Sequence, residues 1–188
     1  SYTVFTDISG EMVARALALA EQEGAEPNSI LGLSLSVDNL ATLSDGDFDL
    51  TLCMGDPLSY CDNHARGIDE LVRITRPGGL IFISVDSRFG YLRIFRDREG
   101  YDLAALEEYL KQGNIIGWEG LPLHTFEKGE LKESFRMRGA DCLGIWELPV
   151  VSSYFLFDPV FQNRLEDKNF RNALDDIEME ALKKGNGA

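Results

Sequence analysis

Side chains that could bind a ligand directly follow the first two predicted strands. Asp7 comes after the strand Tyr2–Thr6, and Ser36-Val37-Asp38 follows Ile30–Leu35. Ligands of open parallel sheets bind beyond the carboxyl ends of the strands, so these positions are where we expect a site. A carboxylate at a strand end can accept hydrogen bonds from both hydroxyls of a ribose. Asp7 fits that role, and it fits equally well as a cap for the helix that starts near Ser9.

Two later strands end in similar runs. Gly55-Asp56-Pro57 follows the strand Phe48–Met54, and Asp86-Ser87-Arg88 follows Leu80–Val85. Phe48–Met54 is apolar at most positions, which is typical of a parallel strand buried on both faces. We therefore expect four strand ends to meet at one edge of a sheet.

Helices must separate these strands. Met12 and Ala16 recur at helical spacing after Ser9, and a second helix capped by Asp62 is expected to end in the turn Arg76-Pro77-Gly78-Gly79. Strands that alternate with helices favour right-handed crossovers. The predicted fold class is α/β: a Rossmann-like, mostly parallel sheet with helices on both faces.

The pattern loosens after Asp86. We interpret residues 87–126 as an inserted lobe that covers an acceptor site, within a single domain over 1–188. Further elements are expected in the second half of the chain. They are a helix at 103–110, a helix at 127–138, a strand at 142–148 and a helix at 163–184.

Composition excludes several classes of protein. The net charge is −14, and residues 1–65 hold eleven acidic residues against one basic residue, Arg15. This charge repels phosphate backbones, so no nucleic-acid partner is expected; the acidity also fits a simple role in solubility. Three widely spaced cysteines suit reduced thiols, and no metal motif is present. No stretch is apolar enough to span a bilayer, so we expect a soluble, cytoplasmic protein without membrane contact.

Three segments carry a resemblance to a known family. They are Val4-Phe5-Thr6-Asp7-Ile8-Ser9-Gly10-Glu11-Met12-Val13-Ala14-Arg15-Ala16, Phe48-Asp49-Leu50-Thr51-Leu52-Cys53-Met54-Gly55, and Glu70-Leu71-Val72-Arg73-Ile74-Thr75-Arg76-Pro77-Gly78-Gly79-Leu80. In their order and spacing these segments resemble the class I S-adenosylmethionine-dependent methyltransferases of the small-molecule type. The resemblance implies S-adenosylmethionine as cofactor and a small molecule as methyl acceptor.

The resemblance also implies a set of cofactor-binding residues. Asp7 would bind the ribose hydroxyls, and Ile8 and Met12 would line the adenine side. Val37 would lie against the adenine ring. Family members usually have an Asp where this chain has Ser36, and Asp38 would replace it only if the loop is displaced. The remaining implied residues are Met54 and Gly55 beside the methionine part, and Leu58 and Tyr60 next to the transferred methyl group.

Methyl transfer needs little acid–base chemistry beyond removal of a proton from the acceptor. Tyr60 and His124 are the candidate catalytic residues, although Tyr60 could simply pack at a helix entrance. His64 is a further candidate base, although it could simply be a solvent-exposed residue in the first turn of its helix. Arg88 and Tyr91 belong to a basic and aromatic run that could hold an acidic acceptor. The arginines of that run could instead form surface ion pairs.

The chain departs from the family pattern at its start. The family's glycine-rich loop should precede Asp7 by roughly twenty residues, yet only six residues precede it. We therefore expect a fragment of a longer protein, or a chain that a partner completes, with a homo-oligomer as one form. A non-catalytic, methyltransferase-like binding or regulatory subunit is the alternative function. A nicotinamide-dependent oxidoreductase is a weaker one, because Gly-x-Gly-x-x-Gly is absent.

Overall fold

The structure is a computed structural model of the chain. It describes residues 2–26, 29–92, 94–95, 102–117, 120–147 and 158–185. The chain forms two compact units, Ser1–Asp141 and Cys142–Ala188. The expected single domain and its lobe at 87–126 remain predictions.

The first unit alternates strands and helices as the sequence predicts. Its first half contains β1 (Thr3–Asp7), α1 (Gly10–Gln22), β2 (Ile30–Ser34), β3 (Phe48–Cys53), α2 (Pro57–Tyr60), α3 (His64–Ile74) and β4 (Thr75–Ile83). Its second half contains the 3₁₀ helix η1 (Phe89–Tyr91), α5 (Leu103–Gln112), β5 (Asn114–Ile116), β6 (Pro122–His124) and α6 (Lys128–Arg136).

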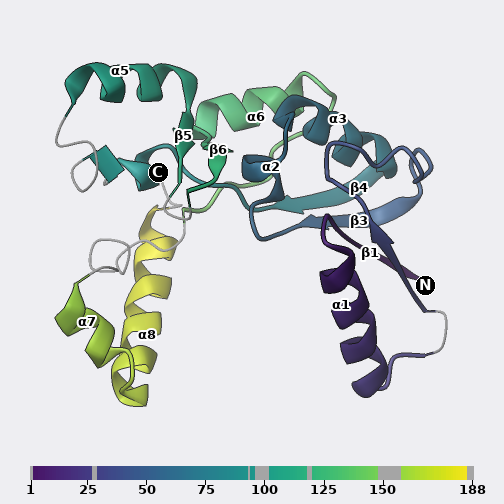
Figure 1. The fold of residues 1–188 in the computed structure, drawn as a ribbon, viewed down its shortest axis with the longest axis horizontal. Coiled ribbons are helices and arrows are strands. Elements are labelled where there is room, and N and C mark those ends of the chain that lie inside the picture. Colours follow the sequence, from purple (N-terminus) through teal and green to yellow (C-terminus); the bar gives the residue numbers. More distant parts are fainter. Residues whose placement is uncertain are drawn as a thin grey trace. The chain divides into compact units, whose positions relative to one another are not determined.

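The strands of the first half form two parallel pairs (Figure 1). β1 pairs with β2, with Val4 opposite Leu31, and β3 pairs with β4, with Leu50 opposite Leu80. In the described parts of the chain no strand bonds β1 to β3, so the expected single sheet is present as two two-stranded sheets. β5 and β6 form a separate antiparallel pair.

The Arg-Pro-Gly-Gly run lies inside a strand rather than in a turn before it. α3 ends at Ile74, and β4 begins at Thr75. The pairing with β3 shifts between Phe48 and Leu50, so residues 76–79 bulge out of the ladder. Gly78 has a φ of 77°, a left-handed conformation that glycine adopts without a steric penalty.

Each parallel pair packs against a different helix, α1 against β1 and β2, and α3 against β4. α1 lies close to β2 because Gly32 has no side chain: a Cβ there would lie 2.7 Å from Val13 and 2.8 Å from Leu17. α3 buries Ile68 and Leu71 in a core cluster with Cys53 of β3. Figure 1 shows α1 below the strands and α2 and α3 above them.

The segment after β4 has a small core of its own. Ile94, Phe95 and Tyr109 are buried together there. This segment is tied to the first half of the unit through α2, which contacts β6, and through Ser59, whose Oγ accepts a hydrogen bond from the Asp86 amide at 2.9 Å.

The second unit contains α7 (Pro159–Arg164) and α8 (Lys168–Gly185). The expected helix at 163–184 is confirmed from Lys168 on, but its start is wrong, because Asp167 accepts hydrogen bonds from the amides of Asn169 and Phe170 and so caps a new helix. The expected strand at 142–148 is also wrong over residues 142–147, which have no strand partner among the described residues; Leu148 lies outside them. None of the described helices combines the length and apolar character that crossing a membrane requires.

Candidate functional site

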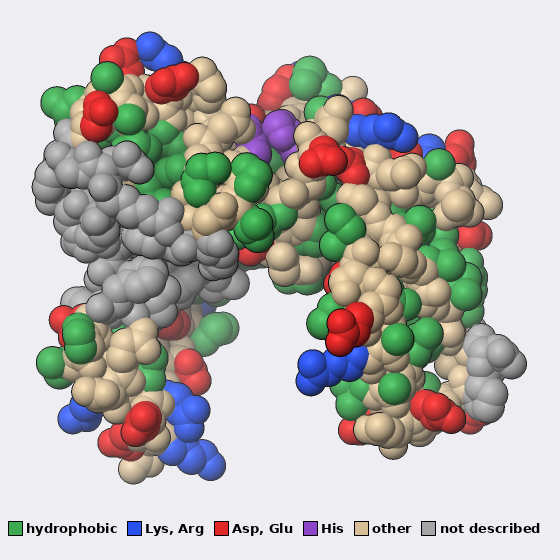
Figure 2. All heavy atoms as spheres, viewed as in Figure 1, with side chains coloured by type: hydrophobic (Ala, Val, Ile, Leu, Met, Phe, Trp, Pro, Cys, Tyr) green, Lys and Arg blue, Asp and Glu red, His purple; other side chains and the backbone are tan. Residues whose placement is uncertain are grey.

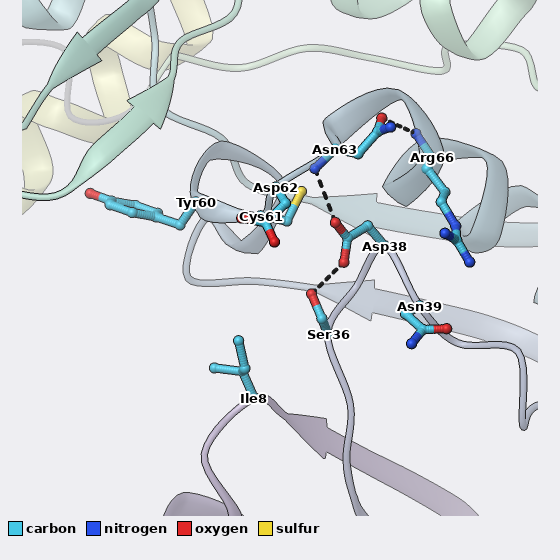
Figure 3. Close-up of a pocket in the computed structure, with 9 residues that line it drawn as sticks. All are labelled: Ile8, Ser36, Asp38, Asn39, Tyr60, Cys61, Asp62, Asn63 and Arg66. Carbon is cyan, nitrogen blue, oxygen red and sulfur yellow. Dashed lines mark hydrogen bonds between the residues drawn. The ribbon is translucent and has the colours of Figure 1, made fainter.

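A cavity of about 420 Å³ opens where β1 and β2 end and the α2–α3 connection begins (Figure 3). It is lined by Ile8, Ser36, Asp38, Asn39, Tyr60, Cys61, Asp62, Asn63 and Arg66. Residues that follow strands of both parallel sheets thus meet at one site, as expected for ligand sites of α/β folds. The volume falls within the ordinary range of small-molecule pockets.

Four of the predicted site residues line this cavity together: Ile8, Ser36, Asp38 and Tyr60. Asp38 is held by two donors. The Ser36 hydroxyl donates to Asp38 Oδ1 at 2.5 Å, and the Asn63 amide donates to Asp38 Oδ2 at 3.0 Å. A carboxylate oxygen has two lone pairs, so Asp38 retains capacity to accept a hydrogen bond from a ligand.

Asp7 also lies at the end of β1, and one of its oxygens is occupied. The Ser9 amide donates to Asp7 Oδ1 at 2.7 Å, while Ser9 caps α1 by accepting from the Met12 amide. Asp7 therefore supports the helix start through one oxygen, and its Oδ2 remains for a ligand. Met12, on the first turn of α1, is 48% exposed.

The other predicted cofactor residues have different surroundings. Met54 is exposed, and Gly55 follows it with a φ of 85°. Val37 is partly buried and packs on the core cluster that contains Leu58. Leu58 has no exposed surface: it points from α2 into the core cluster and does not line the cavity.

His124, a predicted catalytic residue, stacks on His64 (purple in Figure 2). Their ring centroids are 3.9 Å apart with an angle of 14° between the planes. His124 Nδ1 lies 2.9 Å from Asn114 Oδ1, and Nε2 lies 3.4 Å from Glu130 Oε1. Burial lowers the pKa of both imidazoles; for His124 the neighbouring His64 lowers it further. Both rings therefore favour the neutral form.

The predicted substrate residues lie away from the cavity. The Arg88 side chain is 6% exposed and pairs with Glu127 at 3.0 Å and Glu130 at 2.6 Å. It also donates to the carbonyl oxygens of Leu110 and Thr125. The Arg88 guanidinium is therefore bound by residues 110–130 and does not reach the cavity. Tyr91 is partly buried and packs on the small core of the same segment.

Five cavity residues were not predicted: Asn39, Cys61, Asp62, Asn63 and Arg66. The sequence suggested Asp62 as the cap of α3, but Asn63 is the cap and accepts from the Arg66 amide at 3.0 Å. This shift of one residue releases Asp62 to line the cavity. Asp and Asn are both common helix caps, so the sequence also allowed Asn63 as the cap, which would have left Asp62 as a candidate cavity residue.

The thiol pKa values of Cys53 and Cys61 are both raised. The pKa of Cys61 is about 11, because of burial and the nearby Asp38 carboxylate, and that of Cys53 is about 12, mainly because of burial. Both thiols are therefore protonated at neutral pH and are weak nucleophiles. Within the described ranges no group of three or more His, Cys, Asp or Glu side chains is arranged to hold a metal ion.

Comparisons with known proteins bear on this fold and site. Residues 1–79 match the model of a family described as a methyltransferase domain. The fold is similar to that of an S-adenosylmethionine-dependent methyltransferase from Mesorhizobium loti, with a TM-score of 0.59 and 21% identity over 89% of this chain and 76% of that one. The predicted α/β, Rossmann-like fold is confirmed. No curated protein sequence matches the chain significantly.

Two further solved structures share the fold. A Galdieria sulphuraria protein assigned as a sarcosine dimethylglycine methyltransferase has a TM-score of 0.58 and 14% identity over 98% of this chain and 65% of that one. A Haloferax volcanii protein, assigned as a methyltransferase and solved with the Trm112 methyltransferase activator, has a TM-score of 0.55 and 18% identity over 84% of this chain. The chain spans 61% of the length of that Haloferax protein.

Proposed function

We propose that the chain is an S-adenosylmethionine-dependent methyltransferase domain that acts on a small-molecule acceptor. The observation that carries this proposal is the cavity at the strand ends, where Ile8, Ser36, Asp38 and Tyr60 meet. The match of residues 1–79 to a methyltransferase family model supports it, because this segment contains β1, β2 and β3.

The residues at the cavity suit the nucleoside part of this cofactor. Ile8 offers an apolar side chain at the rim, and Asp38 offers carboxylate oxygens for an amino group. Asp7 keeps one oxygen, Oδ2, that could accept from ribose hydroxyls, since Oδ1 receives the Ser9 amide. Apolar walls with a few fixed polar groups are the usual composition of a small-molecule site.

When bound, the cofactor supplies a methyl group on a positively charged sulfur. Transfer by in-line displacement would require this chain's residues to hold the acceptor in line with the carbon–sulfur bond that breaks, and to take up the proton that the acceptor loses. The protein contributes mainly by alignment, which can supply an effective molarity of about 10⁵ M or more. Acid–base demands on this chain's own residues are therefore small.

Tyr60 and His124 are the residues we propose for removal of the acceptor's proton. Tyr60 lines the cavity and is 38% exposed, so a bound acceptor could reach it. The lowered pKa of His124 keeps its ring neutral at pH 7, the form that accepts a proton. The contact between α2 and β6 brings the elements that carry the two residues together.

The acceptor site is proposed to involve the segment at 87–126, including Arg88 and Tyr91. Because the Arg88 guanidinium is engaged by Glu127 and Glu130, its proposed role is to shape this segment. A protein partner, or a second copy of the chain, is also part of the proposal, since one similar structure was solved with a methyltransferase activator.

The test is calorimetric titration of the 188-residue chain with S-adenosylmethionine and with its demethylated product. We expect saturable binding of both, and at least tenfold weaker binding for Asp7→Ala, which loses charge-assisted hydrogen bonds worth about 1.5–3 kcal/mol.

Glu107→Gln is the matched control, because Glu107 is an exposed carboxylate on α5 whose partner is Lys111. It should bind like the wild type. A wild-type chain that binds neither compound, or that binds NAD instead, would contradict the proposal.

A further inference from the structure

The turn after β3 has an unusual backbone. Gly55 and Asp56 both have positive φ values, 85° and 62°. Asp56 is the only non-glycine residue with a positive φ in the described part of the chain. A left-handed conformation is unfavourable for a residue with a Cβ atom, and such residues concentrate at functional sites. Something must therefore hold this turn in place.

The hydroxyl of Ser84 holds it. Ser84 Oγ accepts hydrogen bonds from the Gly55 amide at 2.9 Å and from the Asp56 amide at 3.1 Å. The Ser84 amide in turn donates to the Cys53 carbonyl at 3.0 Å, which continues the ladder between β3 and β4. One side-chain oxygen thus satisfies two consecutive amides and ties the turn to the end of the neighbouring strand.

The same turn determines where α2 begins. The Asp56 carbonyl accepts from the Ser59 amide at 2.9 Å, in the first turn of α2. Ser59 is 1% exposed, and its Oγ accepts from the Asp86 amide, just beyond β4. α2 is therefore attached to the residues after β4 by two serine hydroxyls. Its last residue, Tyr60, lines the cavity.

We infer that Ser84 is a positioning residue for the side of the binding site that faces the reacting end of the ligand. The inference rests on the proposed function, in which Gly55 lies beside the methionine part of the cofactor. Loss of the Ser84 hydroxyl leaves two amides without an acceptor and frees the Gly55-Asp56 turn. The residues expected to contact adenosine follow β1 and β2, whereas the Ser84 hydroxyl accepts its hydrogen bonds from Gly55 and Asp56. We therefore expect its loss to affect the adenosine contacts less than those of the methionine part.

The test compares two ligands on the 188-residue chain. Calorimetry would measure the dissociation constants of S-adenosylhomocysteine and of adenosine for the wild type, Ser84→Ala and Ser84→Thr. We expect Ser84→Ala to weaken S-adenosylhomocysteine binding about tenfold, the effect of one or two lost hydrogen bonds, and to change adenosine binding less than about twofold. Ser84→Thr keeps the hydroxyl and should bind as the wild type does.

Ser44→Ala is the matched control, because Ser44 is an exposed serine in the β2–β3 connection. Amide hydrogen exchange without ligand gives a second readout: the Gly55 and Asp56 amides should exchange faster in Ser84→Ala than in Ser44→Ala.

Equal losses for both ligands would indicate a general structural role and overturn the inference, as would unchanged exchange at these amides. A wild-type chain that binds neither ligand would instead overturn the proposed function, and the inference with it.

Discussion

The two histidines show how position changes the chemistry of a residue. Both are partly buried, and their rings stack between the start of α3 and the end of β6. Glu130 faces both rings and raises their pKa, whereas Arg138 beside His64 and Arg88 beside His124 lower it. Burial is the largest effect, so the pKa of each imidazole lies below its ordinary value. The sequence suggested a role for His124 but gave no sign that His64 would be its partner.

A pH-dependent stability follows at the residue scale. Unfolded histidines titrate near 6.5, and the folded pKa values are lower, so the unfolded chain binds more protons between these values. The contribution of His64 and His124 to the free energy of unfolding is therefore fully present above about pH 6.5, and it is lost as the pH falls through their pKa values in the folded chain. We expect the melting temperature to fall from pH 7.5 to pH 5.5, and to fall less in His64→Phe, which keeps an aromatic ring in the stack.

Differential scanning fluorimetry at the two pH values would measure this. The wild type and His64→Phe also contain the same carboxylates, whose titration cancels in the comparison. An equal pH dependence of the two proteins would show that the pair does not contribute.

At the scale of elements, α1 illustrates an unfavourable charge arrangement. Glu11 lies in its first turn and no basic residue lies in its last turn, where Glu21 is exposed instead. The helix dipole favours negative charge at the start of a helix and positive charge at its end. Glu21 therefore opposes the dipole, and Glu11 complements it.

A pair of charge reversals tests this. We expect Glu21→Lys to raise the free energy of unfolding by about 0.3–1 kcal/mol. Glu11→Lys should raise the free energy of unfolding by less, or lower it. Each substitution changes the net charge by the same amount, so the difference between the two reports the position on the helix. Urea denaturation followed by circular dichroism would measure it. Equal effects of the two variants would assign the change to net charge alone.

At the scale of the whole molecule, the net charge of −14 acts against compactness. Figure 2 shows acidic side chains spread over the visible face, with fewer basic ones among them. Exposed ion pairs such as Lys111 with Glu107 and Arg136 with Glu133 offset part of this repulsion. Exposed pairs of this kind contribute little each, so most of the repulsion remains.

Added salt should therefore stabilise the chain. The Debye length falls from about 30 Å at 0.01 M salt to about 3 Å at 1 M, which screens repulsion between distant charges. We expect the melting temperature to be higher in 1 M than in 0.01 M sodium chloride. A lower melting temperature in the concentrated salt would mean that the ion pairs outweigh the repulsion.

Local patterns in the sequence determined the α/β class and most of the first unit. The alternation of apolar strands with helices, and the Ser9 cap of α1, depend on neighbours in the chain and were therefore readable from it. The runs that follow the strands indicated Ser36 and Asp38, and the family resemblance implied Ile8 and Tyr60; the structure brings all four to one cavity.

The tertiary structure alone decided what each side chain contacts. Leu58 and Arg88 were predicted to face a ligand, but packing buries both side chains, the first in the core and the second against Glu130, with which it forms an ion pair. Ser84 lies 29 residues from Gly55 in the sequence, and only the pairing of β3 with β4 brings its hydroxyl to the turn. Contacts between distant residues depend on strand register and helix packing, and no short-range pattern encodes them.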